Sequence, residues 1–103
     1  MRILDFAING QNLRRKGDFS GIVRGSKNYL RCRFNFEGSD WNGCKVAALF
    51  ESNETVFPTT IDSNRTCTIP DEITDLSTFK IKIIGRKDNY QIVTNNLIIC
   101  QEG

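Results

Sequence analysis

The sequence has 103 residues and a formal net charge of +2, with 39% hydrophobic and 25% charged residues. A chain of this length predicts one domain spanning residues 1–103. The small net charge does not favour nucleic acid as a partner. No apolar run approaches the roughly 20 residues needed to cross a bilayer, so we expect no membrane association. The N-terminal residues show no signal-peptide pattern, which favours a chain that starts and stays in a cytoplasm.

The first apolar alternation, Ile3–Ile8, predicts a strand that ends at the turn pair Asn9-Gly10. Residues 10–27 are then polar and glycine-rich, and they include the basic run at 14–16. We interpret 10–27 as a basic loop or assembly arm, with a short edge strand at 21–24 at most.

The clearest strand pattern lies at residues 28–36, where apolar and polar residues alternate. Residues 37–43, EGSDWNG, form an acidic turn that contains the single tryptophan, Trp41. The next run, 44–52, is apolar on both faces, which is typical of a central strand. The sequence therefore predicts a hairpin over residues 30–50.

Further short strands are predicted at intervals of roughly ten residues. Pro58 lies in one of them and places it at a sheet edge, because proline cannot donate to a ladder. A brief crossover, either irregular or a single helical turn, is predicted between residues 70 and 76. The pattern predicts an all-β fold, an immunoglobulin-like β-sandwich of seven or eight short strands with Greek-key connections. The remaining ranges are strands at 55–59, 66–69, 79–83, 90–94 and 97–100 and a turn at 85–89.

The sequence argues against an enzyme. It contains no histidine, so Ser-His-Asp and Cys-His arrangements are excluded. No glycine-rich phosphate loop is present either. Glu37 and Asp40 are the nearest pair of carboxylates for glycosidase chemistry, and we interpret them instead as turn residues that cap backbone amides. We expect no catalytic residue and no cofactor.

Four cysteines occur without any CxxC spacing. A zinc site would need all four thiolates from distant parts of the chain, because no histidine can contribute. Disulfides are disfavoured without an export signal. We therefore expect no metal, and we interpret Cys32 and Cys44 as small buried hydrophobic residues.

Two features leave alternatives open. The basic residues Arg14, Arg15, Lys16, Arg24 and Lys27 form either contacts to nucleic acid or to an acidic protein surface, or a solvated loop. Trp41 either projects as a binding anchor or folds back to close one end of the sandwich.

Five segments together resemble a group of small β-domains encoded by phages and prophages of Gram-positive bacteria. They occur in order and cover nearly the whole chain: GQNL (10–13), RGSKNYLRCRFNFEGSDWNGCKVAALF (24–50), CTIPDEI (67–73), FKIKIIG (79–85) and IVTNNLIIC (92–100).

The resemblance implies a non-enzymatic virion component that docks on other virion proteins as part of an oligomeric assembly. Such domains often form the N-terminal module of a tail-fibre or baseplate protein. This chain ends at Gly103, so a stand-alone decoration or adaptor protein on capsid or tail is equally open. The expected location is the host cytoplasm during synthesis and the virion afterwards. The residues expected at assembly contacts are Arg14, Arg15, Lys16, Arg24 and Pro58, and the turn expected to face outward contains Asp40, Trp41 and Asn42.

Two other functions remain open at this stage. One is a small intracellular phage protein that binds and inhibits a host protein. The other is a carbohydrate-binding module that uses Trp41 and Tyr90 as stacking platforms and binds a host surface glycan.

Overall fold

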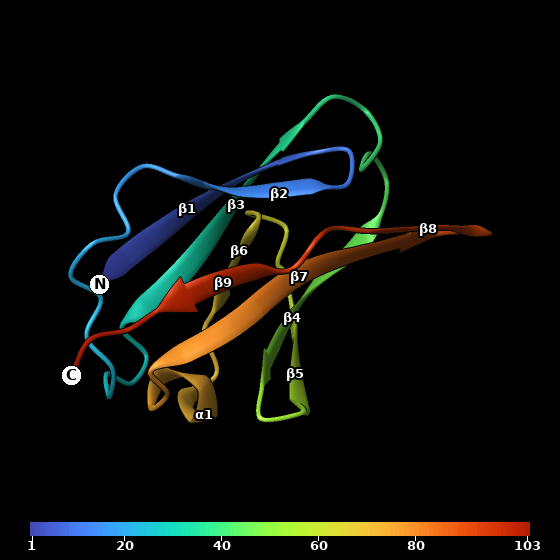
Figure 1. Ribbon diagram of the computed structural model, residues 1–103. Helices are drawn as coiled ribbons and strands as arrows, with labels where there is room; N and C mark the ends of the chain where they lie inside the picture. The colour runs from blue at the N-terminus through green and yellow to red at the C-terminus, as the bar shows by residue number, and fades with distance from the viewer.

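The computed structural model describes residues 1–103 as two β-sheets that pack face to face (Figure 1). The chain is nearly all β, as the sequence predicts, and it has nine strands rather than seven or eight. The elements are β1 (Arg2–Asn9), β2 (Asn12–Lys16), β3 (Leu30–Glu37), β4 (Lys45–Ser52), β5 (Thr55–Thr60), β6 (Thr66–Thr68), α1 (Asp71–Thr74), β7 (Thr78–Lys87), β8 (Tyr90–Val93) and β9 (Leu97–Cys100).

The first sheet has four strands in the order β2-β1-β3-β6. β1 and β2 form an antiparallel hairpin, whereas β1 and β3 run parallel, with Phe6 opposite Phe34. The parallel pair departs from the antiparallel sheets of immunoglobulin domains. It arises because residues 17–29 carry the chain back along the length of β1 before β3 begins.

The second sheet has the order β5-β4-β7-β8, and β9 also pairs with β7. β8 and β9 lie in line along one edge of β7, separated by residues 94–96. β4 is central and β5 is an edge strand that contains Pro58, so both predictions are confirmed.

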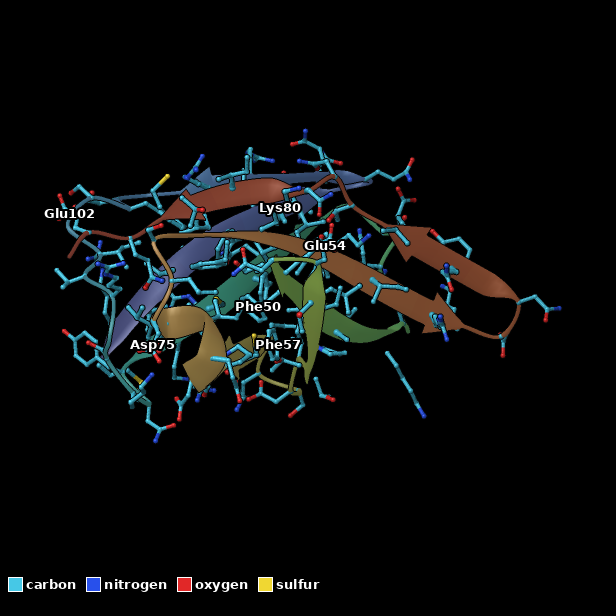
Figure 2. The ribbon with its side chains drawn as sticks, turned by 60° about the horizontal axis from the view of Figure 1, so that its bottom comes forward. Phe50, Glu54, Phe57, Asp75, Lys80 and Glu102 are labelled. Carbon is cyan, nitrogen blue, oxygen red and sulfur yellow. The ribbon has the colours of Figure 1, made fainter.

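The core lies between the sheets and consists of 22 buried residues. These buried residues come from the alternation of side chains along each strand. In β3, for example, Leu30, Cys32 and Phe34 point inward and the arginines point outward. Phe50 of β4 is fully buried in the space between the sheets (Figure 2). The single-turn helix α1 adds Ile73 to this core, so the predicted crossover is a helical turn.

The predicted hairpin at 30–50 is wrong. β3 belongs to the four-stranded sheet and β4 to the five-stranded sheet, so residues 38–44 connect the two layers instead of closing one ladder. The physical reason is that each strand turns a row of buried apolar side chains toward the other sheet. Two such rows bury more surface when packed against each other than when placed side by side in one sheet.

The interpretation of residues 10–27 as an open loop or arm also needs correction. Residues 12–16 form β2, hydrogen-bonded along β1, and the suggested strand at 21–24 is reduced to one bridge between Val23 and Glu102. Ile22 is buried, and the Phe19 ring packs edge-on against Phe6 with 5.2 Å between centroids. Apolar residues spaced along this glycine-rich segment thus anchor it to the core.

Candidate interaction surfaces

The basic residues predicted at assembly contacts do not form one free cluster. Arg14 lies on the outer face of β2, where its guanidinium pairs with Glu37 at 2.9 Å. Arg15 donates to the Ile98 carbonyl of the opposite sheet, and Lys16 lies across the ladder from Asp5. The side chains of Arg14 and Arg15 therefore make contacts within the domain.

Arg24 lies apart from them, beside the end of the chain. Its backbone N–H donates to the Glu102 carbonyl at 2.8 Å, and its guanidinium donates to the Gly103 carbonyl at 3.3 Å. The structure separates Arg24 from the 14–16 run, although both belong to the segment predicted as an arm.

The outer face of the four-stranded sheet balances its own charges. Arg33 binds Asp5 through two hydrogen bonds, of 2.6 and 3.0 Å, and Arg31 lies 3.6 Å from the Asp62 carboxylate. The hydrogen bond from Arg33 lowers the pKa of the Asp5 carboxyl, against the opposing effect of burial. Backbone and side-chain hydrogen bonds from Thr66 likewise lower the pKa of Asp62. This face presents paired charges and few apolar groups.

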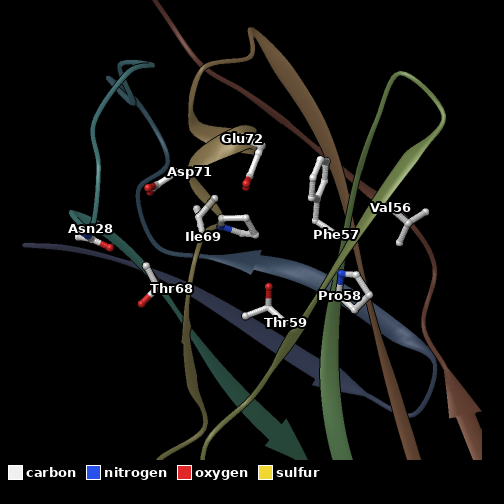
Figure 3. Close-up of a pocket in the computed structure, with 10 residues that line it drawn as sticks. Asn28, Val56, Phe57, Pro58, Thr59, Thr68, Ile69, Asp71 and Glu72 are labelled. Atoms are coloured by element: carbon white, nitrogen blue, oxygen red, sulfur yellow. The ribbon is translucent and has the colours of Figure 1, made fainter.

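Pro58 lines an open groove of about 450 Å³ between the two sheets (Figure 3). β5 and β6, which are the edges of their sheets, form its walls, and α1 contributes Asp71 and Glu72 at one end. The edge strands expose unpaired backbone groups, and such groups accept an added strand from a partner. Pro58, which the sequence predicts at an assembly contact, thus lies on an open sheet edge.

The turn predicted to face outward divides into two parts. Asp40 and Asn42 are exposed, but the Trp41 side chain is only 1% exposed and points into the domain. Its Nε1 donates to the Gly10 carbonyl at 2.8 Å, and its ring lies 5.2 Å from that of Phe36. The second alternative for Trp41, closure of one end of the sandwich, is the one that the structure supports.

Burial of Trp41 removes one of the two stacking platforms expected for a carbohydrate-binding module. Trp41 presents no exposed ring face, because the apolar indole ring gains more from the core than from solvent and its N–H finds a backbone acceptor. Tyr90 remains exposed, and its hydroxyl donates to the Asp40 carbonyl at 3.0 Å.

The cysteines behave as the sequence predicts for Cys32 and Cys44, which are buried free thiols. Cys32 lies directly opposite Cys67 on neighbouring strands. Contact with the Cys67 thiol and burial raise the pKa of Cys32 well above its usual value. Both side chains belong to the buried core cluster, so this pair packs as small hydrophobic residues.

Asn95 has a structural role that residue-by-residue reading missed. It lies between β8 and β9, facing β2, and its Oδ1 accepts from the Leu13 N–H at 2.7 Å while its Nδ2 donates to the Leu13 carbonyl at 3.2 Å. Its side-chain amide thus imitates a ladder partner and joins the edges of the two sheets. Asn95 lies in IVTNNLIIC (92–100), one of the five segments that resemble phage β-domains.

Replacing Asn95 by alanine is expected to lower the free energy of unfolding by about 1–3 kcal/mol, because it leaves both Leu13 backbone groups without their partners. Asn96 is the matched control: it is exposed and only its backbone carbonyl is used. Urea denaturation of Asn95→Ala and Asn96→Ala measures the difference. Equal midpoints for the two variants would contradict the assigned role.

The outer face of the five-stranded sheet is a second feature that the sequence prediction does not identify. Ala47 and Leu49 of β4 point outward there, opposite Ile84 and Lys82 of β7. The sequence feature that corresponds to this face is the run 44–52, which is apolar on both faces. The same feature also predicts a central strand.

Comparison with known proteins adds one finding about the fold. No protein-family model and no curated protein matches this chain. Among solved structures, the N-terminal domain of phage TP901-1 ORF48 matches over 100% of both chains, with a TM-score of 0.56 and 13% sequence identity. The chain therefore shares the fold of a domain that comes from a phage protein.

The one helix of the structure, α1, has four residues and is too short to cross a membrane.

Proposed function

We propose that this chain is a non-enzymatic phage structural or attachment domain that docks on other virion proteins. The observation that carries the proposal is the fold that it shares, over its whole length, with a domain of a phage protein. The five sequence segments that resemble phage β-domains support the same conclusion, and they include Trp41 and Asn95, which hold the fold together.

The local geometry fits a domain that binds rather than catalyses. The Glu37 carboxylate, one of the two acidic candidates, is held by Arg14. The turn around Trp41 is used to close the sandwich, whereas the edge strands β5 and β6 and the outer sheet faces are open. Open edges and faces are the features that assembly through sheet addition or face packing requires.

The finer parts of the proposal concern class and location. We place the domain among immunoglobulin-like sandwiches with Greek-key connections, in a tail-fibre, baseplate or capsid-decoration component of a phage of Gram-positive bacteria. It is synthesised in the host cytoplasm and then built into the virion as part of an oligomer.

Mass spectrometry of purified particles, from the strain that encodes this chain, tests the proposal. The chain is expected in the particles at a fixed ratio to the major capsid protein. A ratio near that of the capsid subunit indicates head decoration, and a few copies per particle indicate the tail. A chain found only in the lysate of induced cells would overturn the proposal and favour an intracellular inhibitor.

A further inference from the structure

The outer face of the five-stranded sheet combines aliphatic and cationic side chains in a regular arrangement. Across its middle, Ala47 lies opposite Ile84, and Ile84 lies opposite Val93. A shallow hollow of about 530 Å³ covers this part of the face. We call this surface the cationic sheet face and define it by the half-buried aliphatic residues Ala47, Leu49, Ile84 and Val93 and the surrounding cations Lys45, Lys80, Lys82 and Arg86.

The four cations of this face form no ion pair within the chain, in contrast to the arginines of the opposite sheet. Glu51 is the one carboxylate that the strands turn outward here, and it lies across from Lys80. At the other end, Lys45 lies directly opposite Arg86. Like charges directly opposite in a ladder destabilise a sheet, so this pair opposes the folding of the isolated domain.

The face therefore carries aliphatic side chains that are still partly exposed to water, and cations that form no ion pair. A surface with apolar and acidic groups would bury the first and pair with the second. We propose that the cationic sheet face docks on a different protein, whose surface presents aliphatic side chains flanked by aspartate and glutamate. The apolar middle of such an interface supplies affinity, and the charges around it supply orientation and specificity.

A second copy of this chain fits the face poorly. A two-fold interface places the same patch on both sides, so four cations and one carboxylate would meet an identical set. On each side the cations outnumber the one carboxylate four to one, so most of the cations of both copies would lack a counter-charge. Charge thus favours a heterologous, acidic partner.

A protein also fits better than nucleic acid or a membrane. The outward residues at the centre are short aliphatic side chains, and none is an aromatic ring that could stack on a base. They are half-buried within the pleat. The two exposed aliphatic side chains of this face, Val56 and Ile98, lie on the strands at its opposite edges and do not form one continuous apolar wedge with them. A pleated, nearly flat surface of this kind packs well against another protein surface.

The inference rests on the proposed function in one respect: the partner is another virion protein. A zero-length carbodiimide crosslinker tests the contact, because it joins only amines and carboxylates that already touch. It is applied to purified particles and, in parallel, to the soluble fraction of induced cells, and the products are mapped by mass spectrometry. Location and contact surface are then determined separately.

The expected result is that Lys45, Lys80 or Lys82 is joined to aspartate or glutamate of a different protein. Links from these lysines to Glu51 of a second copy would overturn the inference, as would links confined to Lys16 or Lys27. If the chain is absent from particles but the same heterologous links form in the soluble fraction, only the proposed virion function is overturned. If the chain is absent from particles and those links do not form, the proposed function and the docking inference are both overturned.

Charge reversal provides an independent test. Lys45→Glu replaces a like-charge pair with an attractive pair to Arg86, so the melting temperature of the isolated domain should not fall. Incorporation of the variant into particles, or its recovery with its crosslinked partner, should nevertheless drop about ten-fold or more. Loss of docking without loss of stability is an effect that a purely structural role would not produce.

Arg24→Glu is the matched control, because it makes the same charge change on an exposed residue outside this face. Its incorporation should stay near the wild-type level. Normal docking of Lys45→Glu together with loss of docking in Arg24→Glu would assign assembly to the 10–27 segment and overturn the inference. If Lys45→Glu is unstable, Lys82→Glu provides the same comparison, since its ladder neighbour is the uncharged Leu49.

Discussion

Replacing Trp41 by alanine is expected to lower the free energy of unfolding by about 3–5 kcal/mol, the range for deletion of a large buried aromatic side chain. The ring is 1% exposed and closes one end of the core, beside Phe36. Its Nε1 also supplies the Gly10 carbonyl with a hydrogen-bond donor, and Gly10 lies in the turn between β1 and β2. The substitution therefore creates a cavity and leaves a backbone acceptor without its partner.

Urea denaturation followed by circular dichroism measures this effect without depending on tryptophan fluorescence. Asn42→Ala is the control, because Asn42 is the exposed neighbour of Trp41 and contributes only backbone groups: its N–H donates to the Ser39 carbonyl, and its carbonyl accepts from Lys87. We expect that control to stay within about 0.5 kcal/mol of wild type, as surface substitutions usually do. A loss below about 1 kcal/mol in Trp41→Ala would show that the ring does not contribute as a core residue.

The sequence predicts the strands well because alternation is a local signal. Two-sided apolarity marked β4 as central, and Pro58 marked β5 as an edge. Pairing is not local, so the same signal could not show that the segments before and after Trp41 join different sheets. β2 was missed for a related reason, since four of its five residues are exposed and only Leu13 carries the alternation.

The candidate surfaces likewise combine local features, which the sequence predicts, with pairing between strands, which it does not. Composition identified the basic residues of the 10–27 segment, but only the structure shows that Arg14 is neutralised by Glu37. Conversely, the unbalanced charge of Lys80 and Lys82 follows from the register: Lys82 lies opposite Leu49, and Lys80 lies opposite Glu51 without forming an ion pair. A charge is balanced or unbalanced according to the residue that lies opposite it on the neighbouring strand. No short sequence pattern shows which residues lie opposite each other.

Gly85→Ala is expected to destabilise the domain by about 1–3 kcal/mol through overpacking. The sequence placed Gly85 at the start of a turn, but β7 continues through it to Lys87. A glycine in the middle of a strand marks a close approach. Here a β-carbon would lie 2.7 Å from Cζ3 of Trp41 and 3.2 Å from Cβ of Cys44, so the indole ring occupies the place of the missing side chain.

This explanation predicts a change of sign in the double variant. With Trp41 replaced by alanine, the added methyl group of Gly85→Ala enters vacated space and removes backbone freedom from the unfolded chain. Gly85→Ala should then be neutral or stabilising, by up to about 1 kcal/mol. A double-mutant cycle from four urea titrations measures the coupling between the two sites. Additive effects would mean that the cost of Gly85→Ala comes from the β7 backbone itself and not from contact with Trp41.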